Sequence, residues 1–380
     1  MTNLNEKIKA SIYLLSYFDT LGFNNTKWEF NYGMDPTNPL ESSFIYLKII
    51  HEFFSLGGFS NINIKDWNSS DDTIMMIATG FACKNGGGEK NYINEYLHIL
   101  PQLKDVKRGS GIHTLDILEK IKRIKSIDKL DYKESAGGNG AAMRTSVIGL
   151  IYYQENDLSK LLENSILSSR VTHNNSLGFL GGLVTALFTS YAIREIPVWD
   201  WIKKLLELYK SGVIDSHLEK TNIFDKYQKD KDLFFDKLEQ YQEQRLDNFT
   251  KKNQPMFFDF KYRLQFLDEY NTYTRKDNTK IYSRYGASGI SSIIVAYDSL
   301  LMSYQGNTWP LDSNFKNLKV SLDSLLFFST LHFGDNDTTG AIAGAWYGAL
   351  YGFKNFDEEK INQLEFKEKL NKLYQLIKQS

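Results

Sequence analysis

The sequence has one cysteine, six prolines and almost no excess of charge of either sign. A single cysteine, Cys83, excludes an intramolecular disulfide and suits a reducing compartment. Because 45 basic residues nearly balance 46 acidic ones, bulk electrostatic attraction to nucleic acid is not expected. The N-terminus has no apolar signal core, and no stretch offers the roughly 18 to 20 apolar residues of a membrane span. We therefore expect a cytoplasmic monomer that binds neither nucleic acid nor membrane.

Helical periodicity dominates what the sequence does contain. Apolar residues recur three and four positions apart in residues 8–15, 201–209, 234–241 and 370–377, and Gly212 follows the second of these as a C-terminal cap. The prolines are expected between such segments, which leaves the helices uninterrupted. Period-2 alternation is scarce, which disfavours all-β and doubly wound folds.

The organisation of the chain follows from these patterns. The most apolar stretch, residues 177–193, is interrupted by glycine and threonine and is interpreted as a buried core helix. A polar stretch at residues 247–280 is the best candidate for a peripheral insertion or long loop. We predict an all-α fold with one domain over residues 1–380, because the two acidic motifs described next lie far apart in the chain and must meet to be useful.

Two acidic loops each lead into an apolar, helix-like run. The first is Ser69-Ser70-Asp71-Asp72-Thr73, and the second is Gly334-Asp335-Asn336-Asp337-Thr338-Thr339-Gly340. Each alone could be an ordinary helix cap. Together their four aspartates could not all stay ionised without a cation. Hard oxygen donors without His or Cys favour Mg²⁺ over zinc. This chemistry predicts a metal-assisted hydrolase and fits a dinuclear phosphohydrolase equally well.

A glycine-rich loop lies between the acidic loops. Its sequence is Gly137-Gly138-Asn139-Gly140-Ala141-Ala142-Met143-Arg144, and an apolar segment follows. Backbone N–H groups exposed at a helix start suit a diphosphate, although the loop lacks the Gly-Lys-Ser/Thr ending of a P-loop. The alternative is that the glycines serve only packing.

The order of these motifs resembles that of the ADP-ribosylglycohydrolase family. Four motifs carry the resemblance, namely Ser-Asp-Asp-Thr, Gly-Asn-Gly-Ala-Ala-Met-Arg, Thr-His and Gly-Asp-Asn-Asp-Thr-Thr-Gly. Further segments, which span nearly the whole chain, are similar to the ADP-ribosylarginine hydrolase branch: Lys27-Trp28-Glu29-Phe30, Leu56-Gly57-Gly58, Asp66-Trp67, Leu187-Phe188-Thr189-Ser190-Tyr191-Ala192 and Ala296-Tyr297-Asp298-Ser299-Leu300.

The resemblance implies an all-helical enzyme with a binuclear Mg²⁺ site, for which Mn²⁺ is a possible substitute. It implies that the protein removes ADP-ribose from arginine side chains of modified proteins, with serine-linked ADP-ribose, O-acetyl-ADP-ribose or simple ADP-ribose binding as alternatives. The implied metal ligands are Ser70, Asp71, Asp72, Asp335, Asp337 and Thr338. The implied substrate contacts are Gly138, Asn139, Gly140, Ala141, Ala142, Met143 and Arg144 through loop amides at the diphosphate, His173 beside the phosphates or ribose, and Gly286, Ser288, Gly289 and Tyr297 at the adenosine end.

Catalysis is expected to depend on Asp71, Asp72 and Glu29. Glu29 lies between two aromatic residues that would raise its pKa toward acid–base use, and the alternative is an ordinary surface glutamate. His173 could instead satisfy a buried carbonyl, and Tyr297 could be a core aromatic.

The sequence also departs from the family pattern. Phe18 replaces the glycine usual before Asp19, Asn174 replaces a common second histidine, and Ile290-Ser291 replaces a His-Asp pair. These departures leave an altered specificity or a slower turnover open.

Overall fold

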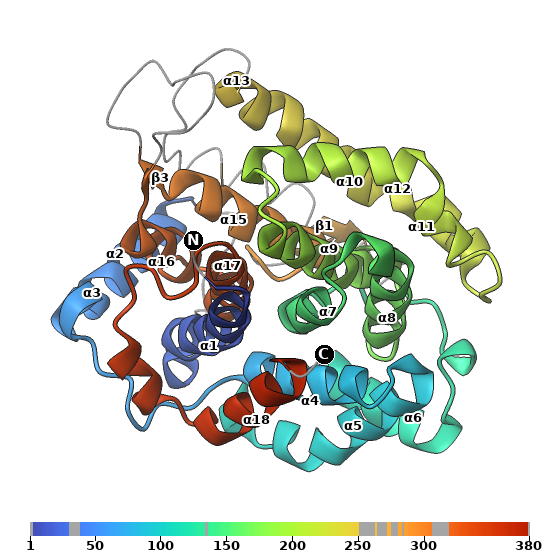
Figure 1. The fold of residues 1–380 in the computed structure, drawn as a ribbon, viewed down its shortest axis with the longest axis horizontal. Coiled ribbons are helices and arrows are strands. Elements are labelled where there is room, and N and C mark those ends of the chain that lie inside the picture. The colour runs from blue at the N-terminus through green and yellow to red at the C-terminus, as the bar shows by residue number, and fades with distance from the viewer. Residues whose placement is uncertain are drawn as a thin grey trace.

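The computed structural model describes residues 3–29, 39–133, 136–250, 263, 272–274, 280–282, 285–305 and 319–378. Within these residues the chain is almost entirely helical (Figure 1). The strands described form two short antiparallel hairpins, β1 (Thr272–Thr274) with β2 (Lys280–Tyr282) and β3 (Tyr304–Gln305) with β4 (Lys319–Val320). The prediction of an all-α fold is confirmed. Most of the expected insertion at 247–280 lies outside the described residues.

Several of the described connections between helices contain a single 3₁₀ turn. Figure 1 shows α10 and α12 running side by side along one edge and α4, α5 and α18 along the opposite edge. Their bounds are α1 Leu4–Phe23, α2 Pro39–Ser55, α3 Gly58–Asn61, α4 Asp71–Lys84, α5 Gly88–Leu103, α6 Ile112–Ile124, α7 Ser146–Ile151, α8 Leu158–Arg170, α9 Ser176–Ile193, α10 Trp201–Lys210, α11 Val213–Ser216, α12 Phe224–Tyr241, α13 Asp247–Thr250, α15 Gly289–Met302, α16 Leu322–Thr330, α17 Asn336–Tyr351 and α18 Lys367–Lys378.

The four periodic segments form the helices predicted for them, namely α1, α10, α12 and α18. Gly212 follows α10 with φ 75°, as expected of a glycine that ends a helix. One expectation about proline is wrong, because Pro101 lies inside α5. The backbone hydrogen bond that Pro101 cannot donate is lost in the last turn of α5, so the interruption does not break the helix.

Helices α1 and α17 form a closely packed central pair. Glycines on both helices allow this approach: a Cβ on Gly348 would lie 2.4 Å from the Ser11 nitrogen, and one on Gly22 would lie 2.5 Å from the Asn336 oxygen. Any side chain at these positions would therefore force the helices apart. The close contact places the C-terminal half of α1 beside the start of α17.

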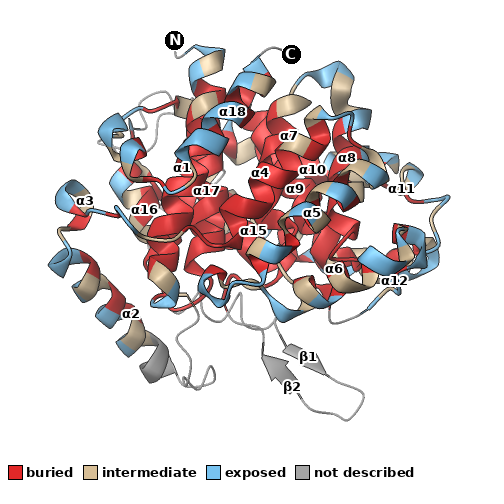
Figure 2. Ribbon diagram, turned by 90° about the horizontal axis from the view of Figure 1, so that it is seen from below, coloured by how far each residue is buried: buried red, intermediate tan, exposed pale blue. Residues whose placement is uncertain are grey.

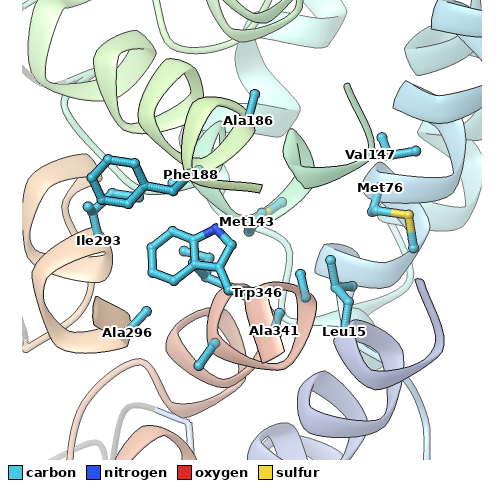
Figure 3. Close-up of a cluster of buried hydrophobic side chains, with 14 of the residues drawn as sticks. Leu15, Met76, Met143, Val147, Ala186, Phe188, Ile293, Ala296, Ala341 and Trp346 are labelled. Carbon is cyan, nitrogen blue, oxygen red and sulfur yellow. The ribbon is translucent and has the colours of Figure 1, made fainter. Parts of the chain in front are cut away.

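Helix α9 lies in the core beside α7, α8 and α15. By length and mean hydropathy α9 is able to cross a membrane, which corrects the expectation that it is too interrupted, but 94% of the 18-residue stretch is buried inside the protein. Figure 2 shows the buried residues concentrated on α1, α4, α9, α15 and α17. In the close-up of Figure 3, Trp346 of α17 faces Phe188 of α9, with ring centroids 5.5 Å apart. The interpretation of residues 177–193 as a core helix is confirmed.

Candidate metal and substrate site

The first acidic loop is held by its own helix cap and by α1. The Ser70 hydroxyl accepts a hydrogen bond from the Asp72 amide at 3.1 Å and so caps α4. Asp19 of α1 accepts hydrogen bonds from the amides of Ser70 and Thr73, both at 3.2 Å. Both carboxylate oxygens of Asp19 therefore hold the loop that carries Asp71. Sequence reasoning noted Asp19 only as half of an altered motif and assigned it no role.

The second acidic loop begins α17. The Asp335 carboxylate caps the helix by accepting from the Thr338 amide at 3.3 Å, and Asp337 accepts from the same amide at 2.9 Å. The other Asp335 oxygen accepts from the Asn139 side chain at 2.7 Å. Asn139, expected to contact substrate, thus ties the glycine-rich loop to the second acidic loop.

Glu29 is brought to the second acidic loop by a tight turn. Asn24, Asn25 and Thr26 have φ angles of 39°, 52° and 73°, a left-handed conformation that non-glycine residues rarely adopt in succession. The buried Trp28 anchors the end of the turn by donating its indole N–H to Glu52 of α2 at 2.8 Å. Carboxylate oxygens of Glu29, Asp335 and Asp337 all lie within 4.8 Å of one another, so these three residues form a possible metal-binding group.

Six carboxylates thus meet at one place, and we call them the acidic cluster. Burial, reinforced by the charge of Asp337, raises the pKa of Asp19 to about 7 and that of Asp71 to about 8. For the same reasons the pKa of Glu29 is raised well above its usual range. The members of the acidic cluster are Asp19, Glu29, Asp71, Asp72, Asp335 and Asp337.

The acidic cluster fits a cation by its chemistry. No lysine, arginine or histidine of the described residues forms an ion pair with any of its carboxylates. One Asp72 carboxylate oxygen is buried without a hydrogen-bond partner. An uncompensated buried carboxylate is costly, and a set of oxygen donors is the environment that hard divalent cations prefer.

Two glycine-containing segments lie next to each other beside the acidic cluster. The Asn139 amide donates to the Ala287 oxygen and the Gly289 amide to the Gly137 oxygen, both at 3.0 Å. Gly286, with φ 85°, packs against Asp335, since a Cβ there would lie 3.2 Å from the Cβ of Asp335. The segments expected at the diphosphate and at the adenosine end therefore form one continuous surface.

His173 lies against the glycine-rich loop. A Cβ on Gly140 would lie 2.6 Å from the imidazole of His173, so the absence of a side chain lets the ring approach the backbone. The His173 Nδ1 lies 2.8 Å from the Thr172 hydroxyl. Burial, and then the positive charge of Arg144, holds the pKa of His173 well below its usual range. The ring is therefore neutral near pH 7.

Part of the glycine-rich loop also has a structural role, and its contacts with substrate stay a prediction. The buried Arg144 guanidinium donates to the Ser168 oxygen at 2.8 Å and to the Thr172 hydroxyl at 2.9 Å, so it supports the loop from within the core. The amides of Asn139, Met143 and Arg144 donate to backbone carbonyls and are not free for a diphosphate. The side chains of Ala141, Ala142 and Met143 are buried.

The residues predicted to contact adenosine have different surroundings in the structure. Tyr297 is buried among core aromatic rings and donates its hydroxyl to the Val198 oxygen at 2.6 Å, the surroundings expected of a core aromatic residue. Ser288 caps α15 by accepting from the Ser291 amide at 3.0 Å. Gly289 is a packing residue, since a Cβ there would lie 2.1 Å from the Leu177 oxygen.

The residues that depart from the family pattern are accommodated within the fold. Phe18 packs against Gly344 of α17, where a Cβ would lie 3.0 Å from its ring. The Asn174 side chain accepts from Arg170 at 2.9 Å, and the Ser291 hydroxyl accepts from the Gly286 amide at 2.9 Å. None of the three departures leaves the first or second acidic loop without its support.

Sequence reasoning missed one further support of the first acidic loop. The Arg108 guanidinium forms two hydrogen bonds with the Glu365 carboxylate, at 2.7 and 2.8 Å, and donates to the Ser69 oxygen at 3.0 Å. The Ser69 amide donates to the same carboxylate at 3.1 Å. Because Arg108 and Glu365 are 257 residues apart, no local pattern could indicate this pair.

Comparison with known proteins gives one consistent family. A family model described as ADP-ribosylglycohydrolase matches residues 2–380. ADP-ribosylhydrolase ARH1 of Dictyostelium discoideum is 33% identical over 389 residues, covering 95% of this chain and 91% of that protein. A protein of Acanthamoeba polyphaga mimivirus named as an ADP-ribosyl glycohydrolase, L444, is 32% identical over 377 residues, covering 95% of this chain and 68% of its own. A solved structure titled an ADP-ribosylglycohydrolase-related protein complex matches with a TM-score of 0.58 at 15% identity, over 100% of this chain and 99% of that chain, which supports the fold alone.

Proposed function

The chain belongs to the ADP-ribosylglycohydrolase family, and from this premise we propose that it hydrolyses the N-glycosidic bond between ADP-ribose and arginine side chains of proteins. The observation that carries the proposal is the acidic cluster, which brings aspartates from both ends of the chain into one buried group. Hydrolysis of an ADP-ribosyl bond is supported by the 33% identity to ADP-ribosylhydrolase ARH1 of Dictyostelium discoideum. The arginine linkage rests on the segments that are similar to the ADP-ribosylarginine hydrolase branch, such as Ala296-Tyr297-Asp298-Ser299-Leu300.

We infer that two Mg²⁺ ions, or Mn²⁺ in their place, bind at the acidic cluster. The unpartnered Asp72 oxygen and the lack of an ion-paired cation among the described residues support this inference. Such ions, when bound, would polarise the ribose hydroxyls and lower the pKa of a water molecule. The residues that would hold them are Ser70, Asp71, Asp72, Asp335, Asp337 and Thr338.

The remaining residues of the site bind the substrate and move protons. The glycine surface around Gly138 and Gly140 accommodates a diphosphate close to the backbone, with the neutral ring of His173 beside it. The carboxylate of Glu29, whose pKa is raised, relays a proton from the attacking water to the leaving guanidino nitrogen as the C–N bond breaks and a C–O bond forms. The surrounding negative charge stabilises the oxocarbenium-like transition state.

The decisive test is to replace one aspartate from each acidic loop. In Asp72→Asn and Asp337→Asn, release of ADP-ribose from arginine-modified protein should fall by about 100-fold or more, because loss of a metal ligand costs at least as much as loss of an outer-shell partner. Asp236→Asn, an exposed position on α12, is the matched control and should retain full activity. Near wild-type activity in either cluster variant would sink the proposal.

The leaving group needs a separate comparison. The wild-type protein should release ADP-ribose faster from arginine-modified protein than from serine-modified protein or from O-acetyl-ADP-ribose. A preference for either of the other substrates would reject the arginine linkage and keep a hydrolase. Tight ADP-ribose binding by calorimetry without hydrolysis of any of the three would instead indicate a binding protein.

A further inference from the structure

Helix α2 carries two apolar faces, one buried and one exposed. Tyr46, Ile49 and Phe53 are buried against the body of the protein. On the other side, Phe44 is 73% exposed, Leu47 63% and Phe54 54%. A helix that packs on a core with one face normally presents charged and polar residues on the other. Figure 2 shows α2 at the edge of the molecule with pale blue, exposed segments on its outer side.

The inner face accounts for how α2 is held on the protein. The Phe53 ring packs edge-on against Trp28 at 6.4 Å between centroids, and the Tyr46 ring packs against Phe327 at 6.2 Å. Glu52 accepts the indole N–H of Trp28. These contacts fix the rotation of α2 about its axis, so Phe44 and Leu47 are presented to solvent in a defined orientation. On the same outer face, the half-exposed Phe54 ring also packs edge-on against Phe53 and Phe59.

The outer face is symmetric along the helix. Phe44, Leu47, His51 and Phe54 are exposed and follow one another at spacings of three, four and three residues, which form one stripe on a helix. The pattern has the same spacing in both directions, with an aromatic residue at each end. Two copies of the stripe related by a two-fold axis would place Phe44 against Phe54 and Leu47 against His51, as an isologous interface requires.

We propose that a second copy of this chain docks on this stripe, with the two α2 helices antiparallel. The charges beside the stripe permit this contact, because Lys48 and Glu52 lie 4.0 Å apart on one copy and leave its flank without net charge. Exposed apolar residues that form a contiguous stripe mark interaction sites, whereas single ones do not. Such a dimer would replace the monomer expected from the sequence.

The interface is expected to be weak. The helix has 17 residues, which corresponds to a length of about 25 Å. One pair of such helices buries an area at the low end of specific protein interfaces, below about 1,200 Å². The dimer should therefore dissociate on dilution within an accessible concentration range.

Sedimentation velocity of the full chain over a wide concentration range tests the proposal. The wild-type protein should shift from one chain to two with increasing concentration, and Leu47→Glu should weaken dimerisation by about tenfold or more, because it buries a charge at the centre of the stripe. Val106→Glu, at an apolar residue that is 90% exposed and far from α2 in sequence, is the matched control and should dimerise like the wild type. A monomer at every concentration, or a dimer that Leu47→Glu leaves unchanged, would overturn the proposal.

Cross-linking distinguishes the antiparallel arrangement from other contacts. When the Leu47→Cys and His51→Cys proteins are mixed, a short bis-maleimide should link them efficiently. The same reagent should link two copies of either variant alone much less. The only native cysteine, Cys83, is buried and serves as the background. Equal cross-linking of either variant alone would overturn the antiparallel pairing. Binding of a monomeric wild type to anionic phospholipid vesicles that Leu47→Glu abolishes would overturn the second copy as the occupant.

Discussion

Two sets of buried carboxylates in this protein have opposite electrostatic environments. Asp298 of α15 is 2% exposed, lies 3.2 Å from Arg263, is paired with Arg245 and accepts a hydrogen bond from Tyr241 at 2.6 Å. Burial alone would raise the pKa of Asp298, but the two arginines outweigh it and lower the pKa. In the acidic cluster burial is the largest cause of every raised pKa, and for five of the six carboxylates the charges of neighbouring carboxylates act in the same direction.

The difference distinguishes a structural carboxylate from a functional one. The charge of Asp298 is neutralised by the chain itself, so this residue needs nothing from solution. The acidic cluster has no such partner among the described residues, and full ionisation of its carboxylates requires a cation from outside. A buried acid is thus informative about function only together with the positive charges around it.

The largest expected effect comes from removing the carboxylate that the chain neutralises. Asp298→Asn should lower the free energy of unfolding by about 3 kcal/mol or more, because it removes the carboxylate that pairs with the buried Arg263 and the half-buried Arg245. Asp72→Asn should change the stability of the metal-free protein little or raise it, because it removes one of several repelling charges. Urea unfolding in the presence of a chelator measures both. Equal losses in the two variants would contradict the distinction.

Metal binding should act only on the acidic cluster. At about a hundredfold excess over its dissociation constant, Mg²⁺ should stabilise the wild-type protein by about 2.7 kcal/mol, seen as a higher melting temperature. The double variant Asp72→Asn/Asp337→Asn should show no such rise, while Asp298→Asn should keep it. A rise of equal size in the double variant would place the bound ion elsewhere.

The sequence does not show that the chain itself neutralises the charge of Asp298. Asp298 and Asp337 both stand in segments that resemble one family, and both are followed by small or apolar residues. What separates them is Arg245 and Arg263, which lie 53 and 35 residues before Asp298. Arg263 lies within the stretch predicted to be peripheral, and Arg245 lies just before it. Long-range ion pairs have no local signature.

The fold and most of the acidic cluster were predictable because their signals are local in the sequence. Helix periodicity is local, so α1, α10, α12 and α18 followed from spacing alone. The acidic loops have helix-start signals and a recognisable order, which let Asp72 and Asp337 be assigned to one site. Asp19 was missed because it lies in the middle of an amphipathic pattern, where a carboxylate that holds a distant loop resembles one that faces solvent.

Acid should weaken the contribution of Asp298. Because its folded-state pKa lies below the ordinary value of an aspartate, its ion pairs stabilise the protein above that ordinary value and are lost as the pH falls toward the folded-state value. The stability difference between the wild type and Asp298→Asn should therefore shrink below about pH 4. Urea midpoints of both proteins across the acid range measure it. A difference that stays constant would mean that Asp298 does not titrate in this way.

The smallest effects come from two tyrosines in contact with each other. The rings of Tyr241 and Tyr297 lie 5.9 Å apart, and each hydroxyl donates one hydrogen bond of 2.6 Å, to the Asp298 carboxylate and to the Val198 carbonyl respectively. A bond to a charged acceptor contributes more, so Tyr241→Phe should cost about 2 kcal/mol of unfolding free energy and Tyr297→Phe about 1 kcal/mol.

The contributions of the two tyrosines can be separated by repeating both substitutions in the Asp298→Asn protein. The cost of Tyr241→Phe should fall in that background because its charged acceptor is gone, whereas the cost of Tyr297→Phe should stay the same. Tyr297→Phe should also leave the KM for an ADP-ribosylated substrate unchanged, since its hydroxyl is committed to Val198 inside the core. If the KM rose while stability did not change, Tyr297 would belong to the substrate site, and the division between structural and functional groups in this part of α15 would have to be redrawn.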